Sequence, residues 1–316
     1  MGGLANIIAD SSYNGPNVGY SLPVSRGART VLFPRVDGPT SIANKVDVLA
    51  GGVGNATVVG TPGYGAGYAS FTTASNYFNS GSLDASTTTI MAVVRASQSF
   101  INGPTQPIIG GNFTLGVSGL HLAFDDNIGA KGFVARRVTT VSGVPTNSSP
   151  LRLQYGASFT ASISGSTMTV TGAPVGVIAI GNTIFGSNVT SGTMVVSGGT
   201  GTGGVGTYNL NVSSNASGAM AAIGDWAFVA CSFQNGGNIT IYNKTLGISN
   251  FLAVTTSHIA GAGNFKVGTS FSNTVGGLCD IAYWAEHNVA LTTFEIDSIY
   301  QAVKSKLSSY STPIII

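Results

Sequence analysis

Residues 224–233 read GDWAFVACSF, and together with the segments that follow them they predict how the chain folds. This run is apolar on both faces, which is typical of a strand buried between two layers. The turn QNGG at 234–237 leads into NITIYN at 238–243, whose alternation predicts the second strand of a hairpin. Two further strands, NFKVG at 264–268 and LCDIAYW at 278–284, extend an antiparallel β pattern.

One helix is predicted after these strands, from about Thr293 to Leu307. Thr292 and Glu295 have the spacing of a capping box, in which each side chain binds the other residue's backbone N–H. The apolar side chains of this segment fall on one helical face: Ile296, Ile299, Tyr300, Val303 and Leu307. The helix is therefore expected to pack on the rim or the back of a β-sandwich.

These segments resemble, in motif and in order, the C-terminal half of the laminin-G-like, concanavalin A-like lectin family. The shared motifs are W-x-x-V-A from Trp226, I-x-I-Y from Ile239, F-x-V-G from Phe265, D-I-A from Asp280 and L-T-x-x-E-I from Leu291. The resemblance extends more faintly over residues 69–124. It implies an all-β, concanavalin A-like jelly-roll sandwich that presents a surface to a partner, and it does not identify that partner.

The segment 158–219 differs from its surroundings, because charged residues vanish and short alternating strands appear. Its pattern, FTASISG, MTVT and then GTGTGGVGTY at 199–208, resembles a module of bacteriophage tail and virion proteins. In such proteins the module has a structural or adhesive role. We therefore expect a small inserted β module at 158–219 within a discontinuous sandwich formed by 27–157 and 220–310.

Both ends of the chain have features of contact segments. Residues 1–26 are rich in Gly, Asn and Ser and predict an extended arm that cannot bury Ile7 and Ile8 by itself. The tail 311–316 is unusually apolar for a free end, and we expect Ile314, Ile315 and Ile316 to lie in a groove on a partner subunit. The ends therefore predict a homo-oligomer, and the resemblance to phage fibre proteins favours a trimer.

The composition narrows the classes of partner. Hydrophobic residues make up 43% of the 316 residues, so the chain is expected to fold, while charged residues reach only 8%. Low charge gives little mutual repulsion and favours self-association. The net charge of +2, with Arg136-Arg137 as the only basic pair, argues against nucleic acid. No apolar run is long enough for a membrane helix, and residues 1–10 do not have the features of a secretory signal.

The chemistry of a glycosidase is not predicted, because it requires a pair of carboxylates across a sugar bond. The two glutamates are Glu286 and Glu295, and Glu295 is explained as a helix cap. Asp125-Asp126-Asn127 follows a strand and fits either a polar turn or a calcium site, which needs six or more oxygen ligands. We expect no enzyme activity and no cofactor, with calcium as the one alternative.

Exposed aromatic rings are candidates for contact with a sugar. Tyr13, Tyr20, Tyr77 and Phe78 are expected in loops. The two cysteines, Cys231 and Cys279, fall in predicted buried strands. They are either reduced core thiols or, if those strands are neighbours, a disulfide.

Together these features predict a bacteriophage virion surface protein of the tail fibre, tail tip or capsid fibre, assembled in the host cytoplasm. Its expected role is attachment to a host surface glycan, alongside contacts with other virion proteins. The alternatives are a capsid decoration or fibre subunit with a purely structural role, or a tailspike that degrades polysaccharide, which the missing carboxylate pair argues against.

Overall fold

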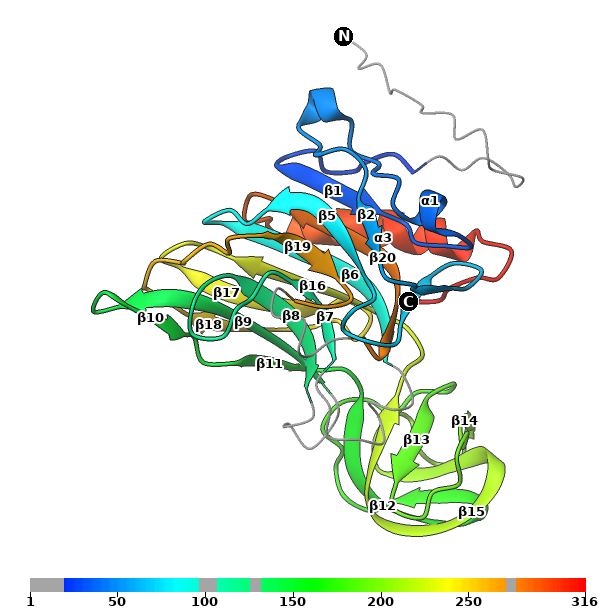
Figure 1. The fold of residues 1–316 in the computed structure, drawn as a ribbon. Helices are drawn as coiled ribbons and strands as arrows, with labels where there is room; N and C mark the ends of the chain where they lie inside the picture. Colours follow the sequence, from blue (N-terminus) through cyan, green and yellow to red (C-terminus); the bar gives the residue numbers. More distant parts are fainter. Residues whose placement is uncertain (1–19, 97–106, 126–131, 271–276) are drawn as a thin grey trace.

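Two antiparallel sheets pack face to face, and a third, smaller sheet stands beside them (Figure 1). This computed structural model describes residues 20–96, 107–125, 132–270 and 277–316. The predicted fold class, an all-β sandwich with one short C-terminal helix, is confirmed. No helix in the described ranges is long and apolar enough to span a membrane.

The first sheet contains the strands predicted from the C-terminal quarter. Its order is β18 (Ile248–Ala253), β17 (Asn238–Asn243), β16 (Ala227–Phe233), β6 (Thr88–Ala96), β20 (Cys279–His287), β4 (Ala69–Phe71) and β3 (Gly63–Tyr64), and β1 (Ala28–Leu32) also pairs with β20. The hairpin expected after residue 233 is present, because β16 pairs with β17 through Phe233 and Ile239.

The second sheet is built mostly from the first half of the chain. Its order is β10 (Val144–Asn147), β9 (Gly132–Val141), β8 (Leu120–Asp125), β7 (Ile108–Gly111), β19 (Asn264–Val267), β5 (Tyr77–Leu83) and β2 (Thr57–Val59), and β11 (Leu151–Gln154) also pairs with β9. Two short helical turns, α1 (Gly38–Ser41) and η1 (Val48–Ala50), lie in the N-terminal connections.

Between the two sheets lies the main hydrophobic core. Its largest side chains come from both sheets: Phe71, Phe78, Phe124, Phe133, Phe233, Phe265 and Trp284. Cys231 and Cys279 are part of this core, and both are free thiols. Burial raises the pKa of each thiol, so both are unreactive at neutral pH.

The first sheet is also covered on its outer face. Helix α3 (Thr293–Ser308) lies against it and buries the five apolar residues of the predicted stripe. The capping box is present, with Thr292 and Glu295 each accepting from the other residue's backbone N–H. Arg26 also forms an ion pair with the carboxylate of Glu295, with 2.7 Å between Nη2 and Oε2. The pKa of Glu295 is lowered to about 2, first by the hydrogen bond from Arg26.

The C-terminal tail corrects one prediction. Ile314 and Ile316 are each 5% exposed and belong to the core beneath α3, whereas Ile315 is 68% exposed. The tail therefore fills a groove on its own chain, and these two side chains need no partner subunit. Ile315 is the tail residue that stays available for an external contact. Ile7 and Ile8 lie outside the described residues.

A third sheet is formed by residues 157–223, close to the range expected for the inserted module. Its order is β12 (Ala157–Val170), β15 (Gly206–Ile223) and β13 (Thr183–Gly186), and β14 (Val195–Gly198) also pairs with β15. The sheet has its own core, which includes Phe159, Ile163, Met168, Tyr208 and Met220. We call residues 157–223 the module.

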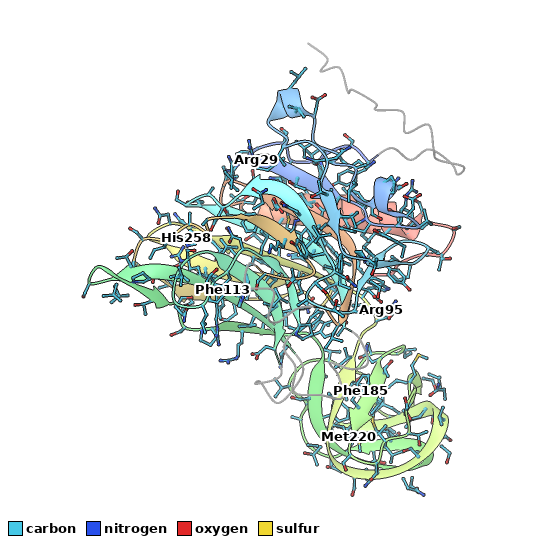
Figure 2. The ribbon with its side chains drawn as sticks, viewed as in Figure 1. Arg29, Arg95, Phe113, Phe185, Met220 and His258 are labelled. Atoms are coloured by element: carbon cyan, nitrogen blue, oxygen red, sulfur yellow. The ribbon has the colours of Figure 1, made fainter. Side chains whose placement is uncertain are left out.

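The two strands that enter and leave the module run side by side, since Ala157 pairs with Ala222. The buried Tyr155 hydroxyl lies 3.2 Å and 3.0 Å from the carbonyl oxygens of Gly224 and Asp225. Arg95 sits at this junction (Figure 2), paired with Asp280 at 2.7 Å and Asp225 at 3.2 Å. Its guanidinium carbon also lies 4.9 Å and 4.6 Å from the ring centroids of Tyr68 and Trp226. We call this junction the neck.

Because both module strands leave through the neck, the sandwich is expected to fold without the module. Residues 158–219 would be replaced by a short Gly-Ser linker. The expected result is a near-ultraviolet circular dichroism signal from Trp284 and a cooperative melt, with the midpoint lowered by at most several degrees. A variant that melts without cooperativity would show that the sandwich needs the module.

The burial of the tail predicts unequal effects of its three isoleucines. Ile314→Ala and Ile316→Ala are each expected to lower the free energy of unfolding by roughly 2 kcal/mol or more, because each leaves a cavity. Ile315→Ala, the matched control, is expected to change it by less than about 0.5 kcal/mol. Urea unfolding at equilibrium measures all three. Equal effects would contradict this packing of the tail.

Candidate ligand-binding face

The outer face of the second sheet carries the best candidate site. Strand residues alternate between faces, and Phe78, Phe265, Leu120 and Ala135 point into the core. Their strand neighbours therefore point outward. We call the following residues the ligand face: Tyr77 and Asn79 from β5, Lys266 from β19, His121 and Asp125 from β8, Arg136 from β9, and Arg152 from β11.

Strand register places part of this face in one row. Asn79 pairs with Lys266, Lys266 with Gly111, Gly111 with His121, and His121 with Arg136. The row crosses five neighbouring strands, so its ends are about 19 Å apart at the usual strand spacing of about 4.8 Å. The middle of the row, Gly111 and His121, is buried, so a ligand could reach only the half-buried side chains on either side of it.

The ligand face is positively charged. Among the residues in the strands of the second sheet, Lys266, Arg136 and Arg152 are outward cations and Asp125 is the one carboxylate. Asp125 is buried and forms an ion pair with Arg152. Burial and then the nearby charge of Arg152 lower the pKa of Arg136, and Asp125 acts in the opposite direction.

An aromatic ring lies next to one of these cations. The Lys266 ammonium lies 4.7 Å from the centroid of the Tyr77 ring, and both side chains are half-buried. Burial lowers the pKa of Lys266. The distance of 4.7 Å is that of a cation–π interaction, in which the ammonium occupies one face of the ring.

His121 supplies the unsatisfied polar atoms of the ligand face. Its ring packs against Phe113 in a tilted arrangement, with 4.4 Å between the ring centroids. Burial and then the charge of Arg136 lower the pKa of His121 to about 3, so the ring is neutral at neutral pH. Within the described part of the chain, neither ring nitrogen has a hydrogen-bond partner, nor does Nε of Arg136. Unused buried polar atoms are uncommon in proteins and cost stability.

The structure separates the aromatic residues that the sequence grouped together. Tyr77 lies on the ligand face, but in strand β5 rather than in a loop. The prediction for Phe78 is wrong, because its side chain is 0% exposed in the main core. Tyr20 lies outside the strands, as predicted, but its ring packs on Phe33 with 4.7 Å between the ring centroids and its hydroxyl is buried, so it does not offer an exposed contact. Tyr13 lies outside the described residues.

The candidate calcium ligands are only partly described. Asp125 is 0% exposed and its carboxylate is engaged by Arg152, so the structure does not present it as a free metal ligand. Asp126 and Asn127 lie outside the described residues. Within residues 20–96, 107–125, 132–270 and 277–316, no group of three His, Cys, Asp or Glu side chains is placed to hold a metal ion.

Glu286 lies inside the sandwich rather than on a surface. Its carboxylate accepts hydrogen bonds from Trp284 Nε1 at 2.6 Å and from Ser80 Oγ at 3.1 Å. Burial raises the pKa of Glu286 to about 7. Glu295, the other glutamate, is fixed at the helix start by Arg26 and by the backbone. Neither carboxylate flanks a site where a glycosidic bond could be placed.

The sequence did not reveal Lys266, Arg136 and Arg152 as members of one face. Arg136 was visible only as half of a basic pair, and on a strand two adjacent residues point in opposite directions. Arg137 accordingly points inward, is fully buried, and donates to the carbonyl oxygens of Gly237 and Val254 at 3.0 Å each. Alternation within a correctly placed strand was the signal that could have separated the two arginines.

Comparison with known proteins gives only distant structural matches. No protein-family model matches the chain, and no curated protein matches it. The binding domain of botulinum neurotoxin serotype D is 12% identical, with 89% of this chain and 52% of that chain aligned at a TM-score of 0.48. The receptor-binding domain of the botulinum neurotoxin C/D mosaic serotype is 9% identical, over 88% of this chain and 52% of that chain, at 0.46.

A more distant similarity is to Trypanosoma rangeli sialidase, 11% identical over 92% of this chain and 35% of that chain, at a TM-score of 0.40. The chain thus spans about half the length of the neurotoxin domains it matches. These similarities concern β-rich architecture and are too distant to transfer a function. The resemblance to bacteriophage virion proteins stays a prediction from the sequence.

The environment of Glu286 predicts a pH-dependent stability. Its folded pKa of about 7 lies above the ordinary value of 4.5, so its contribution is fully present below pH 4.5 and is lost as the pH rises through 7. The difference in free energy of unfolding between wild type and Glu286→Gln is therefore expected to fall by about 3 kcal/mol as the pH rises from 4.5 to above 7. Urea unfolding at several pH values measures this difference.

Glu295→Gln is the control with the opposite sign. Its folded pKa is depressed to about 2, so its contribution is present above pH 4.5 and is lost only as the pH falls through 2. The difference between wild type and Glu295→Gln should therefore be flat between pH 5 and pH 8. Parallel profiles for wild type and Glu286→Gln over the same range would contradict the burial of an ionisable Glu286.

Proposed function

We propose that the chain is a bacteriophage virion surface protein that attaches to an acidic host-surface glycan through the ligand face. The observation that carries this proposal is the set of half-buried side chains Tyr77, Asn79, Lys266 and Arg136 on this face, in which both charged groups are cations. The sequence resemblance to lectin-like and virion proteins supplies the class of ligand and the setting. The expected location is the virion surface after assembly in the host cytoplasm.

The chemistry of the ligand face favours a glycan that carries carboxylates. Arginine and lysine bind carboxylates through charge-assisted hydrogen bonds, which are stronger than neutral ones. The Tyr77 ring offers a flat surface for a sugar ring next to Lys266. Asn79 adds an amide that both donates to and accepts from hydroxyl groups.

We propose binding without cleavage, and without a nucleic-acid partner or insertion into a membrane. Glycoside hydrolysis needs a carboxylic acid and a carboxylate on either side of the scissile bond. On the ligand face the one described carboxylate, Asp125, is held by Arg152. This arrangement supports a role as a receptor-binding protein over a polysaccharide-degrading tailspike.

A structural role as a fibre or decoration subunit is the second candidate. It is favoured by the uncharged surface of the module, which suits packing between protein subunits better than recognition of a charged ligand. In either role we propose a homo-oligomer that contacts other virion proteins, and the resemblance to phage fibres favours a trimer.

The ligand face is tested by calorimetric titration with an acidic capsular polysaccharide and with the same polymer after reduction of its carboxyl groups. Lys266→Ala and Arg136→Ala are each expected to weaken binding roughly 10- to 100-fold, as the loss of one charge-assisted hydrogen bond predicts. Lys304→Ala, on helix α3, is the matched control and should leave binding unchanged. Binding should also weaken as salt is added.

Two results would contradict the proposal. One is equal binding of the reduced and the unreduced polymer, because the cations would then have no role. The other is equal binding by wild type and by the double variant of Lys266 and Arg136. Release of reducing ends during the incubation would show cleavage and overturn the assignment as a non-enzymatic binder.

A further inference from the structure

The module surface differs in kind from the rest of the molecule. Between Arg152 and Asp225 the sequence contains no Asp, Glu, Lys, Arg or His, so every charged group of the chain lies outside the module. The module still exposes large aliphatic side chains. Five of them are about half exposed or more: Val175, Val177, Ile180, Val196 and Val205. Single exposed aliphatics are ordinary, but a group of them without charged neighbours indicates a contact surface.

Backbone hydrogen bonds bring together the segments that carry four of these residues. Ile178 N donates to Gly203 O at 3.0 Å, which joins the segment of Val177 to the loop of Val205. Gly181 N donates to Val195 O at 2.8 Å, which joins the segment of Ile180 to the strand of Val196. We call Val177, Ile180, Val196 and Val205 the module patch.

Glycine allows this close packing at one point. Gly203 has φ of +105°, and a Cβ at that position would lie 2.8 Å from Cγ1 of Val177. The Gly-rich loop of residues 198–206 therefore lies directly against the segment of Val177. The loop forms part of a defined surface rather than a free connection.

The chemistry of the module patch excludes several occupants. Sugar binding uses exposed rings, whereas Phe159 and Tyr208 are buried in the module core and Phe185 packs against the sandwich core. Nucleic acids and acidic ligands need cations, and the module has none. A neutral, aliphatic surface is complementary to another surface that is also neutral and aliphatic. A second copy of this chain offers such a surface on its own module, which contains no charged residue.

We infer that the module is a self-association element, and that module patches of neighbouring copies pack against one another. The module stands beside the sandwich (Figure 1) and also contacts the sandwich core next to the neck, through Phe185, Ala221 and Ile223, so copies can meet at the rest of the module while their ligand faces remain open. This contact differs from the one expected of the chain ends, since Ile314 and Ile316 are buried within their own chain. It also does not depend on the ligand face.

Sedimentation velocity of the full-length protein, over concentrations from about 0.1 to 50 µM, tests this inference. The wild type is expected to sediment as an oligomer. The double variant Val177→Lys with Val196→Lys is expected to raise the dissociation constant at least roughly tenfold, because it places charges on both sides of the contact. Leu49→Lys and Phe294→Lys are matched controls, since both residues are exposed aliphatic or aromatic side chains of the sandwich. These controls should remain oligomeric.

Added salt should not dissociate the wild-type oligomer, because no ion pairs contribute to the contact. Circular dichroism and melting confirm that each variant is folded. The inference is overturned if the wild type is monomeric throughout the range, or if the folded module variant stays as oligomeric as the controls. Binding of a monomeric wild type to neutral phosphatidylcholine vesicles would assign the patch to lipid and would also overturn it. The proposed function is tested separately by titrating the monomeric variant with polysaccharide, because the ligand face of each copy should still bind when the oligomer is lost.

Discussion

The central strands of the first sheet have to be covered on both faces, and much of the molecule is arranged to meet that requirement. Every residue of β16 is buried, and every residue of β6 except Arg95. One face is covered by the second sheet. The other is covered by α3, the C-terminal tail and the segment around β1. Burial of such strands from water is the dominant favourable contribution to folding.

This requirement also determines where function can lie. The outer face of the first sheet is committed to α3 and the tail, so it cannot serve as a broad binding surface. The second sheet has only one face in the main core, and its other face carries half-exposed cations and Tyr77. The pair Arg136 and Arg137 shows the division within two residues. Arg136 points away from the core. The side chain of Arg137 points into the core and donates to backbone carbonyl oxygens of the β16–β17 turn.

Local sequence signals predicted the elements well. The capping box and apolar stripe of α3 depend on residues within four positions of one another, and the structure has both. The strands around Phe233 and Ile239 follow from alternation and a Gly-containing turn. What local patterns could not predict was which face of a strand meets which layer. Tyr77 and Phe78 are equivalent in propensity, and only the position of the opposite sheet makes one half-exposed and the other buried.

The same limit explains the tail and the ligand face. Ile314 and Ile316 were correctly identified as needing burial, but the groove they fill is formed by α3 and distant strands that a sequence pattern does not locate. Likewise, Asn79, Lys266 and Arg136 come from three separate parts of the chain and become neighbours in one row only through the register of five strands. Such proximity is a property of topology rather than of spacing.

The pairing of Ala157 with Ala222 at the neck has a consequence for the order of folding. Without the module structure, joining the two halves of the sandwich would require closing a loop of more than sixty residues, an entropic cost of about 4 kcal/mol by the usual logarithmic scaling. The module supplies this closure through the pairing of β12 with β15, which runs from Ala157–Ala222 to Val170–Gly206. Once formed, it holds residues 156 and 224 close together, so the first and second halves of the sandwich meet as though they were joined by a tight turn.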